Sequence, residues 1–387
     1  MLLIGVLTGL IILVILVVIH ELGHGIVARR NGVKVEEFGV GFPPLAWGKK
    51  VKNSILGKNV HYTLNWLPLG GFVKLQGEYD SANQKGDYGA ATYWQKTKIL
   101  LAGVLMNWVA AIVLFTFLAL IGMPKILPNQ FSIPSDTKTT TQPLIAAEVE
   151  TSSPAESAGL RKGDQILLIG TTDVQSPTQL SNATKANRGK KITVTYSRAN
   201  RESTVDVQLR SKATATKGYL GVRTTQQLSE IRTTWSAPIV GVATTVQLTG
   251  ETFASLGKVV SSLAEGIISR FSPDVSTRKS GDEALSYASN SVSGPVGILG
   301  VIFPQMQQAG IKPLILLTAI ISLSLAVMNV LPIPALDGGR WFTMTIYKLL
   351  KRPLTKEREE KIQTIGFIAL LGLIVLVTVA DVGKLFN

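Results

Sequence analysis

The sequence predicts a polytopic α-helical membrane protein with four transmembrane helices, a membrane-associated β-loop and an inserted extracytoplasmic domain rich in β-strands. Three observations support this fold class. The 387 residues are 46% hydrophobic and only 17% charged. Four stretches reach the length of about 20 mainly apolar residues that a helix needs to cross a bilayer. A long segment between the second and third stretches has the pattern of short strands, and the chain is long enough for one membrane domain and one soluble domain.

The composition excludes several kinds of site and partner. A net charge of +14 at first suggests a nucleic-acid-binding protein, but such proteins are usually far more polar, so we expect no nucleic-acid partner. The absence of cysteine excludes disulfides, thiolate nucleophiles and cysteine zinc sites. The three histidines leave room for one small imidazole metal site at most.

The predicted transmembrane helices are residues 1–28, 99–123, 313–337 and 362–380. The alternative for the first is a cleaved signal peptide, which has basic residues before its apolar run and a small-residue cleavage site after it. No Lys or Arg precedes this run, and no such cleavage site occurs before Arg29. We therefore expect the first stretch to remain as a membrane span.

The basic residues predict the orientation of these helices. The two short loops, residues 29–98 and 338–361, hold 18 Lys and Arg in 94 residues, whereas residues 122–312 hold 20 in 191. Short loops rich in Lys and Arg stay on the cytoplasmic side of a membrane. We therefore expect both short loops in the cytoplasm, and both termini and the long segment outside it.

Residues 143–223 alternate apolar and polar side chains in four short segments, which predicts a small β-rich domain. A turn-rich run containing Gly159 and Gly163 separates the first two strands, and a short helix is expected to begin after Ser176. This order of elements resembles a PDZ domain of the permuted bacterial type. PDZ domains bind chain ends by strand addition, but the sequence identifies no groove residue, so a PDZ-shaped spacer without a peptide ligand stays an alternative.

Two further segments follow this domain. Apolar residues in 225–270 recur at helical spacing on one face, which predicts an amphipathic helix at the membrane surface. Residues 271–310 are expected to form a polar, serine-rich loop that includes the Ser-Gly-Pro-Val-Gly segment at 293–297.

The strongest chemical signal is His20-Glu21-Leu22-Gly23-His24 at the end of the first apolar stretch. Residues i and i+4 share one face of a helix, so both imidazoles can bind one zinc ion, and Glu21 can accept a proton from its bound water. A shuffled chain of this composition would contain the pattern only about 0.001 times. Ionisable residues are also costly inside a bilayer, so three of them here predict a functional site.

A catalytic zinc ion usually has three protein ligands and a water molecule, so a third ligand is needed. Without cysteine, the choice lies between His61 and a carboxylate. His61 falls on the polar side of an alternating segment, where a surface strand position is the simpler interpretation. Asp337 is the better candidate because it ends an uncharged span on the same side of the membrane as the two histidines.

Two motifs resemble a known family. The HELGH motif of the first span, and Asn329–Gly339 with the sequence NVLPIPALDGG, are similar to those of the site-2 protease family of intramembrane zinc metalloproteases. The order of parts agrees along nearly the whole chain, and it most resembles the bacterial group with a single PDZ domain that cleaves membrane-bound anti-sigma factors. The resemblance implies that His20, His24 and Asp337 bind Zn²⁺ and that Glu21 is the catalytic base.

The resemblance also implies a substrate-binding role for two asparagines. The amide of Asn329 would hold the unwound substrate backbone, and Asn107 follows Ala102-Gly103 at the spacing of a second asparagine in the family. The family usually has proline where this chain has Val104, which leaves the local turn undecided.

Residues from about 47 to 75 resemble the membrane-associated β-loop of the family and include Gly70 and Gly71. A helical substrate hides its amides, so cleavage requires an extended backbone, with which an edge strand can pair. We therefore expect Gly70 and Gly71 to bind substrate. An ordinary surface hairpin is the alternative interpretation.

These features together predict a zinc-dependent intramembrane endopeptidase of the inner (plasma) membrane, surrounded by lipid, with its active site near the cytoplasmic side. The resemblance implies that the substrate is a single-span membrane protein, such as an anti-sigma factor that another protease has already trimmed, and that the PDZ domain excludes untrimmed substrates by size. Two alternatives stay open. One is an inactive membrane scaffold that recruits partners through its PDZ domain, and the other is a metal transporter, although transporters usually have repeated halves.

Overall fold

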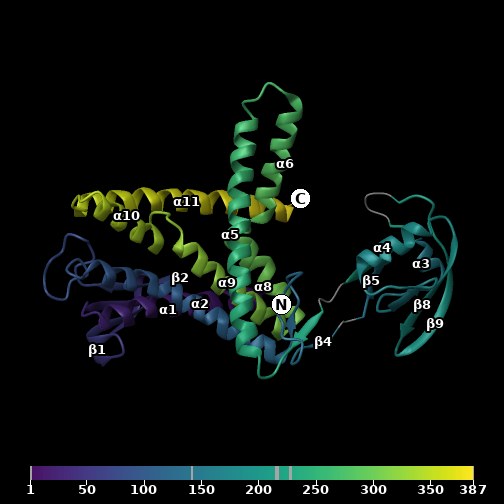
Figure 1. Ribbon diagram of the computed structural model, residues 1–387, viewed down its shortest axis with the longest axis horizontal. Coiled ribbons are helices and arrows are strands. Elements are labelled where there is room, and N and C mark those ends of the chain that lie inside the picture. Colours follow the sequence, from purple (N-terminus) through teal and green to yellow (C-terminus); the bar gives the residue numbers. More distant parts are fainter. Residues whose placement is uncertain (1, 141–142, 214–217, 226–228, 387) are drawn as a thin grey trace. The chain divides into compact units, whose positions relative to one another are not determined.

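The computed structural model shown in Figure 1 describes all residues except 1, 141–142, 214–217, 226–228 and 387. The chain divides into two compact units. The membrane unit consists of Met1–Ile121 together with Trp235–Asn387, and the β-rich unit consists of Gly122–Thr234.

Within the described part of the chain, four helices of the membrane unit are long and apolar enough to cross a bilayer. An apolar stretch without proline beyond its first turn can satisfy its backbone N–H and C=O groups within the segment only as a helix. Many exposed Leu, Ile and Val side chains cover these helices, as expected for surfaces that face lipid. The predicted fold class is confirmed by α1 (Leu2–Arg30), α2 (Tyr93–Ile121), α9 (Ile311–Val330) and α11 (Lys356–Phe386).

The third span differs from its predicted bounds of 313–337. Helix α9 ends at Val330, and a new helix, α10 (Asp337–Leu349), begins at Asp337. Pro332 and Pro334 between them lack a backbone N–H and disfavour the helical conformation of the residue before each. Asp337 is therefore the first residue of a separate helix, not the end of the span.

The β-loop is a long antiparallel hairpin of β1 (Val35–Ser54) and β2 (Gly57–Leu75). Val40 pairs with both Leu64 and Gly71, so the first part of β1 lies between two parts of β2. The last part of β2 is consequently an edge, with which no other strand among the described residues pairs.

This hairpin begins earlier than the predicted residue 47. Val35 and Phe38 are buried and pack with the ends of α1 and α2, which draws the first part of β1 into the sheet. The same cluster includes Leu56, Val60 and Ile99, so the hairpin is fixed to the helices that carry the candidate site.

The region predicted as one amphipathic helix, 225–270, begins with strand structure instead. The helix is α5 (Ala237–Ser269), which starts at a position where Pro238 fits the first turn. Before it, Glu230–Arg232 form the short strand β11, which belongs to the β-rich unit.

The predicted polar loop, 271–310, is mostly helical, so that prediction was wrong. Helix α6 (Val275–Ser291) begins at Asp274, whose carboxylate accepts hydrogen bonds from the backbone N–H groups of Ser276 and Thr277. Helix α6 lies beside α5 (Figure 1), where a Cβ atom on Gly266 would be 2.3 Å from Leu285 Cγ. The sequence did not predict this helix because its composition is polar. Close contacts at glycines, rather than a wide apolar face, pack α6 against α5. It is followed by α7 (Pro295–Gly297), η1 (Ile298–Ile302) and α8 (Phe303–Ala309).

The β-rich unit has the order of elements that the sequence predicts for residues 143–223. Its larger sheet is antiparallel with the strand order β10-β5-β6-β8-β9, and β7 pairs with β6. Twelve buried hydrophobic residues form its core. The strands are β5 (Ile145–Val149), β6 (Gln165–Ile169), β7 (Thr172–Asp173), β8 (Lys191–Arg198), β9 (Arg201–Gln208) and β10 (Val222–Thr225), with the helices α3 (Pro154–Ser157) and α4 (Pro177–Ala186).

A second, small sheet joins the first and last segments of this unit, where the chain enters and leaves it. In it, β11 pairs with β3 (Met123–Pro124) and with β4 (Lys138–Thr140). The start and the end of the inserted unit are therefore hydrogen-bonded to each other.

An ion pair between the buried carboxylate of Asp164 and the exposed guanidinium of Arg198 stabilises the turn-rich run of the β-rich unit. Arg198 binds the Asp164 carboxylate with two hydrogen bonds, of 2.6 Å from Nε and 2.7 Å from Nη2, and the backbone N–H of Arg161 donates a third. Burial of the Asp164 carboxyl opposes its ionisation, but Arg198 and the Arg161 amide outweigh that effect and lower its pKa.

Candidate active site

Helix α1 and the start of α10 bring three potential metal ligands together. His20 and His24 lie one turn apart on α1, and Asp337 is the first residue of α10. Asp337 Oδ2 is 3.0 Å from His20 Nε2 and 3.2 Å from His24 Nε2, and the two Nε2 atoms are 3.2 Å apart. Among the residues that the structure describes, this is the one group of His and carboxylate side chains close enough to share a metal ion.

These distances fit a zinc ion. Ligands at about 2.0–2.1 Å from zinc in a tetrahedron lie about 3.3 Å from one another, close to the separations here. Two imidazole nitrogens and one carboxylate oxygen also form a donor set typical of catalytic zinc, which keeps its fourth position for water. Both histidines are buried.

Helix α2 orients both imidazoles. His24 Nδ1 donates a hydrogen bond to the backbone carbonyl of Ile99 at 2.7 Å, which leaves the Nε2 lone pair free for a metal. The side chain of Asn107 lies against His20, with 3.4 Å between Asn107 Nδ2 and His20 Nδ1.

The amide of Asn107 offers a second test of the metal site. Its Oδ1 atom is buried without a hydrogen-bond partner in this structure. If His20 Nε2 binds a metal, Nδ1 carries the proton and needs an acceptor. Turning the Asn107 amide exchanges its oxygen and nitrogen, so that Oδ1 can accept a hydrogen bond from His20 Nδ1.

Gly103 makes room for the metal. A Cβ atom at this position of α2 would lie 2.4 Å from His24 Nε2 and 2.7 Å from His20 Nε2. A side chain there would occupy the space between the imidazoles. Sequence reasoning singled out the Ala102-Gly103 motif but did not predict this role for its glycine.

The edge of the β-loop passes beside Glu21. A Cβ atom on Gly71 would lie 3.2 Å from Val17 Cγ1 and 3.7 Å from Glu21 Cγ. This part of β2 therefore packs beside Glu21. Gly70 has a φ of +108° and lies against the ring of Phe42.

Two other predicted residues form their contacts with residues outside the three-ligand group. Asn329 is near the end of α9, and its Nδ2 donates to the Leu325 carbonyl at 2.9 Å. His61 pairs with Glu37 and Lys50 in the hairpin and is not a member of the metal-binding group. The choice of Asp337 over His61 thus agrees with the geometry.

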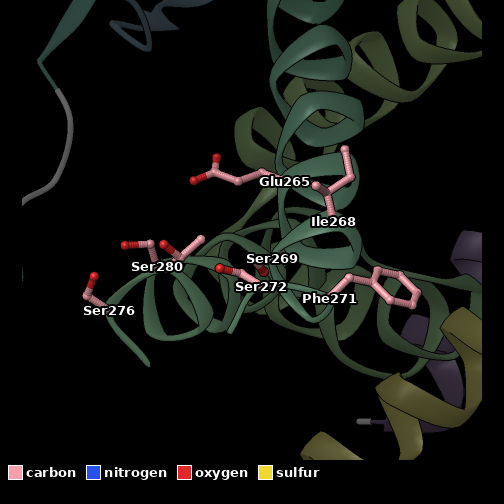
Figure 2. Close-up of a pocket in the computed structure, with 8 residues that line it drawn as sticks. Glu265, Ile268, Ser269, Phe271, Ser272, Ser276 and Ser280 are labelled. Carbon is pink, nitrogen blue, oxygen red and sulfur yellow. The ribbon is translucent and has the colours of Figure 1, made fainter. Parts of the chain in front are cut away.

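A pocket at the turn between α5 and α6 offers a contrast (Figure 2). It is lined by hydroxyl groups, by Ile268 and Phe271, and by one carboxylate, Glu265. This lining contains no histidine and therefore lacks the donor set of the histidine cluster.

Comparison with known proteins decides the family. The sequence pattern described as Peptidase family M50 matches residues 8–373, nearly the whole chain. The chain belongs to peptidase family M50. This M50 protein is a zinc metalloprotease, zinc is its cofactor, and the predicted resemblance to the site-2 protease family is confirmed.

Individual relatives of this M50 protease match over their full length. A Clostridium perfringens protein whose name places it with the zinc metalloproteases is 30% identical over 367 residues, covering 95% of each chain. The zinc metalloprotease RasP of Geobacillus kaustophilus is 25% identical over 453 residues, covering 96% of each chain. The regulator of sigma-W protease RasP of Bacillus subtilis is 26% identical over 462 residues, covering 98% of this chain and 99% of the relative.

The PDZ domain of the SdrC-like protein from Listeria monocytogenes, a solved structure, is also similar to part of this M50 protease. It covers 23% of this chain and 93% of its own, with 21% identity and a TM-score of 0.20. The PDZ-like character of the β-rich unit rests on its own order of strands and helices.

Proposed function

We propose that this zinc metalloprotease is an intramembrane endopeptidase that cleaves a peptide bond in or near the transmembrane segment of a membrane protein. The observation that supports it is the position of the donor set: His20 and His24 lie within an apolar spanning helix, Asp337 contacts both of them, and β2 passes beside Glu21. A site of this kind acts on a substrate that is itself in the membrane.

In this proposal His20, His24 and Asp337 bind the zinc ion. When bound, zinc polarises the scissile carbonyl and lowers the pKa of its water ligand. The carbonyl of Ile99 and the amide of Asn107 hold the two imidazoles in the orientation that binding requires. We thus assign Asn107 to the orientation of His20, in place of the substrate contact that the sequence suggested.

Glu21 is the proposed general base. It follows the first ligand directly in α1, and β2 packs beside its side chain at Gly71. From there it takes a proton from the attacking water and delivers it to the leaving amine.

The edge of β2 is the proposed substrate-binding strand. A substrate helix must unwind before its carbonyl can be attacked, and the exposed amides then need partners in a medium without free water. The last part of β2 has an unpaired edge beside Glu21, and Gly71 brings the backbone close to it. Gly70 would shape this edge, and Asn329 would bind the unwound backbone beyond it.

The biological setting is also part of the proposal. The density of Lys and Arg favours a cytoplasmic location for residues 29–98 and 338–361, with both termini and the β-rich unit outside an inner membrane. The name of the Bacillus subtilis relative refers to regulation of a sigma factor, which favours a single-span anti-sigma factor as substrate. The PDZ-like unit would then exclude substrates whose outer domain another protease has not yet removed.

Glu21→Gln tests the enzymatic role. The full-length variant should keep its zinc and lose cleavage of membrane substrates by at least about 100-fold, because general-base catalysis contributes that much. Membrane proteins of cells with wild-type or variant protein are compared, and a truncated protein found only with the wild type identifies the substrate. Glu251→Gln on α5, an exposed position, is the matched control. Equal cleavage by wild type and Glu21→Gln would leave only a scaffold role.

A further inference from the structure

The segment that carries Asp337 is held by one face of α11. Glu359, Gln363 and Gly366 are spaced four and three residues apart, so they lie on the same side of the helix. Each of them contacts residues 334–340, which include the turn after α9 and the first turn of α10.

Gln363 and Gly366 hold the turn itself. Gln363 Oε1 accepts a hydrogen bond of 2.7 Å from the backbone N–H of Ala335. Ala335 has a φ of +76°, a conformation that residues other than glycine rarely adopt and that persists only where the surroundings impose it. A Cβ atom on Gly366 would lie 2.3 Å from Pro334 Cβ, so the absence of a side chain lets α11 approach the turn.

Glu359 holds the first turn of α10 through an ion pair. Its Oε1 accepts from Arg340 Nε at 3.1 Å, and its Oε2 accepts from the backbone N–H of Asp80 at 2.9 Å. The Glu359 side chain is only 4% exposed. A buried carboxylate with a cationic partner and a second hydrogen bond has little freedom to move.

Two further contacts fix the other end of this ion pair. The Arg340 guanidinium also donates to the carbonyl of Glu78 and lies 4.7 Å from the centre of the Tyr88 ring. Tyr88 is buried. Arg340 therefore connects α10 both to α11 and to the segment that follows the β-loop.

Asp337 depends on these contacts for its position. Its carboxylate touches His20 and His24, and Leu336 before it provides no side-chain cap for the helix. The place of the carboxylate therefore follows from the backbone of 334–340. We propose that Glu359 and Gln363 are positioning residues that hold Asp337 at the distance from the two histidines that zinc binding needs. This inference rests on the proposed zinc site.

Two conservative substitutions test it in the purified full-length protein. Glu359→Gln removes the charge and keeps the shape, and Gln363→Met removes the acceptor for Ala335 and keeps the length. Both should weaken zinc binding by about tenfold, the lower end of the effect of removing a supporting hydrogen bond around a metal. Glu357→Gln, an exposed glutamate two residues before Glu359, is the matched control and should bind zinc like the wild type.

Zinc affinity is measured by competition with a chromogenic chelator, and the visible absorption of the Co²⁺-substituted protein reports the ligand geometry. The melting temperature without metal is measured in parallel. A variant with a lower melting temperature but unchanged zinc affinity and Co²⁺ spectrum would show a merely structural role and overturn the proposal. Should Glu359→Gln not fold, Gln363→Met, which keeps the ion pair, decides by the same criteria.

A His24→Ala variant distinguishes failure of the positioning role from failure of the proposed zinc site. If His24→Ala keeps wild-type zinc affinity, the proposed metal site is wrong. If His24→Ala loses zinc while both α11 variants bind it like the wild type, the metal site stands and the positioning role of α11 is wrong.

Discussion

The two parts of the candidate site are built in different ways. His20 and His24 stand on one uninterrupted helix, and the helical repeat alone puts them on one face. Asp337 stands at a break between two helices, where prolines end α9 and no local repeat directs the side chain. The histidine pair is therefore a local structure, whereas the carboxylate is in place only because distant segments hold it.

The two parts should therefore respond differently to substitution. A change in α1 removes a ligand and leaves the framework intact. A change in the turn before α10 leaves Asp337 present but displaces its carboxylate.

The largest effect is expected for His24→Ala. One of the three proposed protein ligands is lost, which should cost on the order of 3–5 kcal/mol of zinc binding, or about a thousandfold in affinity. Zinc content after gel filtration and the chelator titration measure it. The helix should persist, because alanine is a good helix former, and unchanged circular dichroism checks this. Full zinc occupancy in the variant would remove His24 from the ligand set.

Gly338→Ala should have the next largest effect. A Cβ atom there would lie 2.2 Å from the carbonyl oxygen of Val330, so the first turn of α10 must shift away from α9 and carry Asp337 with it. We expect zinc affinity to fall by about 100-fold although every ligand is present. Gly372→Ala on α11, where a Cβ atom meets open space, is the control. Wild-type affinity in Gly338→Ala would mean that the turn tolerates displacement.

Asn107→Leu tests how the histidine pair is supported. Leucine fills a similar volume but cannot accept a hydrogen bond from His20, so zinc affinity should fall by about tenfold. Asn329→Leu should leave zinc affinity unchanged and raise the KM of cleavage, because Asn329 is proposed to bind substrate. Weaker zinc binding in Asn329→Leu, with a raised KM and unchanged zinc affinity in Asn107→Leu, would instead assign Asn329 to the metal site and Asn107 to substrate binding.

The smallest effect on the site is expected from the β-rich unit. Asp164→Asn breaks the pair with Arg198, and amide hydrogen exchange in β6 and β8 should speed up by about tenfold, while zinc affinity is unchanged. A loss of zinc would contradict the separation of the chain into two units.

The pH dependence of the same pair has a definite sign. The pKa of Asp164 is lower in the folded protein than in the unfolded chain, where it is about 3.9. The pair therefore adds stability that is fully present above that value and is lost as the pH falls toward the folded pKa. The protection factors for exchange in β6 and β8 of the wild type, which correct for the intrinsic pH dependence of exchange, should fall below about pH 4, and Asp164→Asn should lack this change.

Much of the fold follows from composition and pattern. Four uncharged apolar stretches predict four helices because no other structure satisfies their backbone in lipid. The alternating segments of residues 143–223 predict the strands of the β-rich unit, which the structure has in the same order. Helix α6 escaped prediction because its stability comes from glycine contacts with α5, which leave little apolar periodicity to detect.

The sequence by itself determined the chemistry of this protein: two histidines and a glutamate at helical spacing in an apolar segment, in a chain without cysteine, leave few choices other than a zinc site. Only the tertiary structure decided where the remaining parts meet. Gly103 leaves space between the imidazoles, the edge of β2 lies beside Glu21, and the turn with Asp337 rests on α11. The physical reason is the sequence separation of the interacting residues. A helical repeat relates residues only a few positions apart, whereas these contacts join segments tens to hundreds of residues apart.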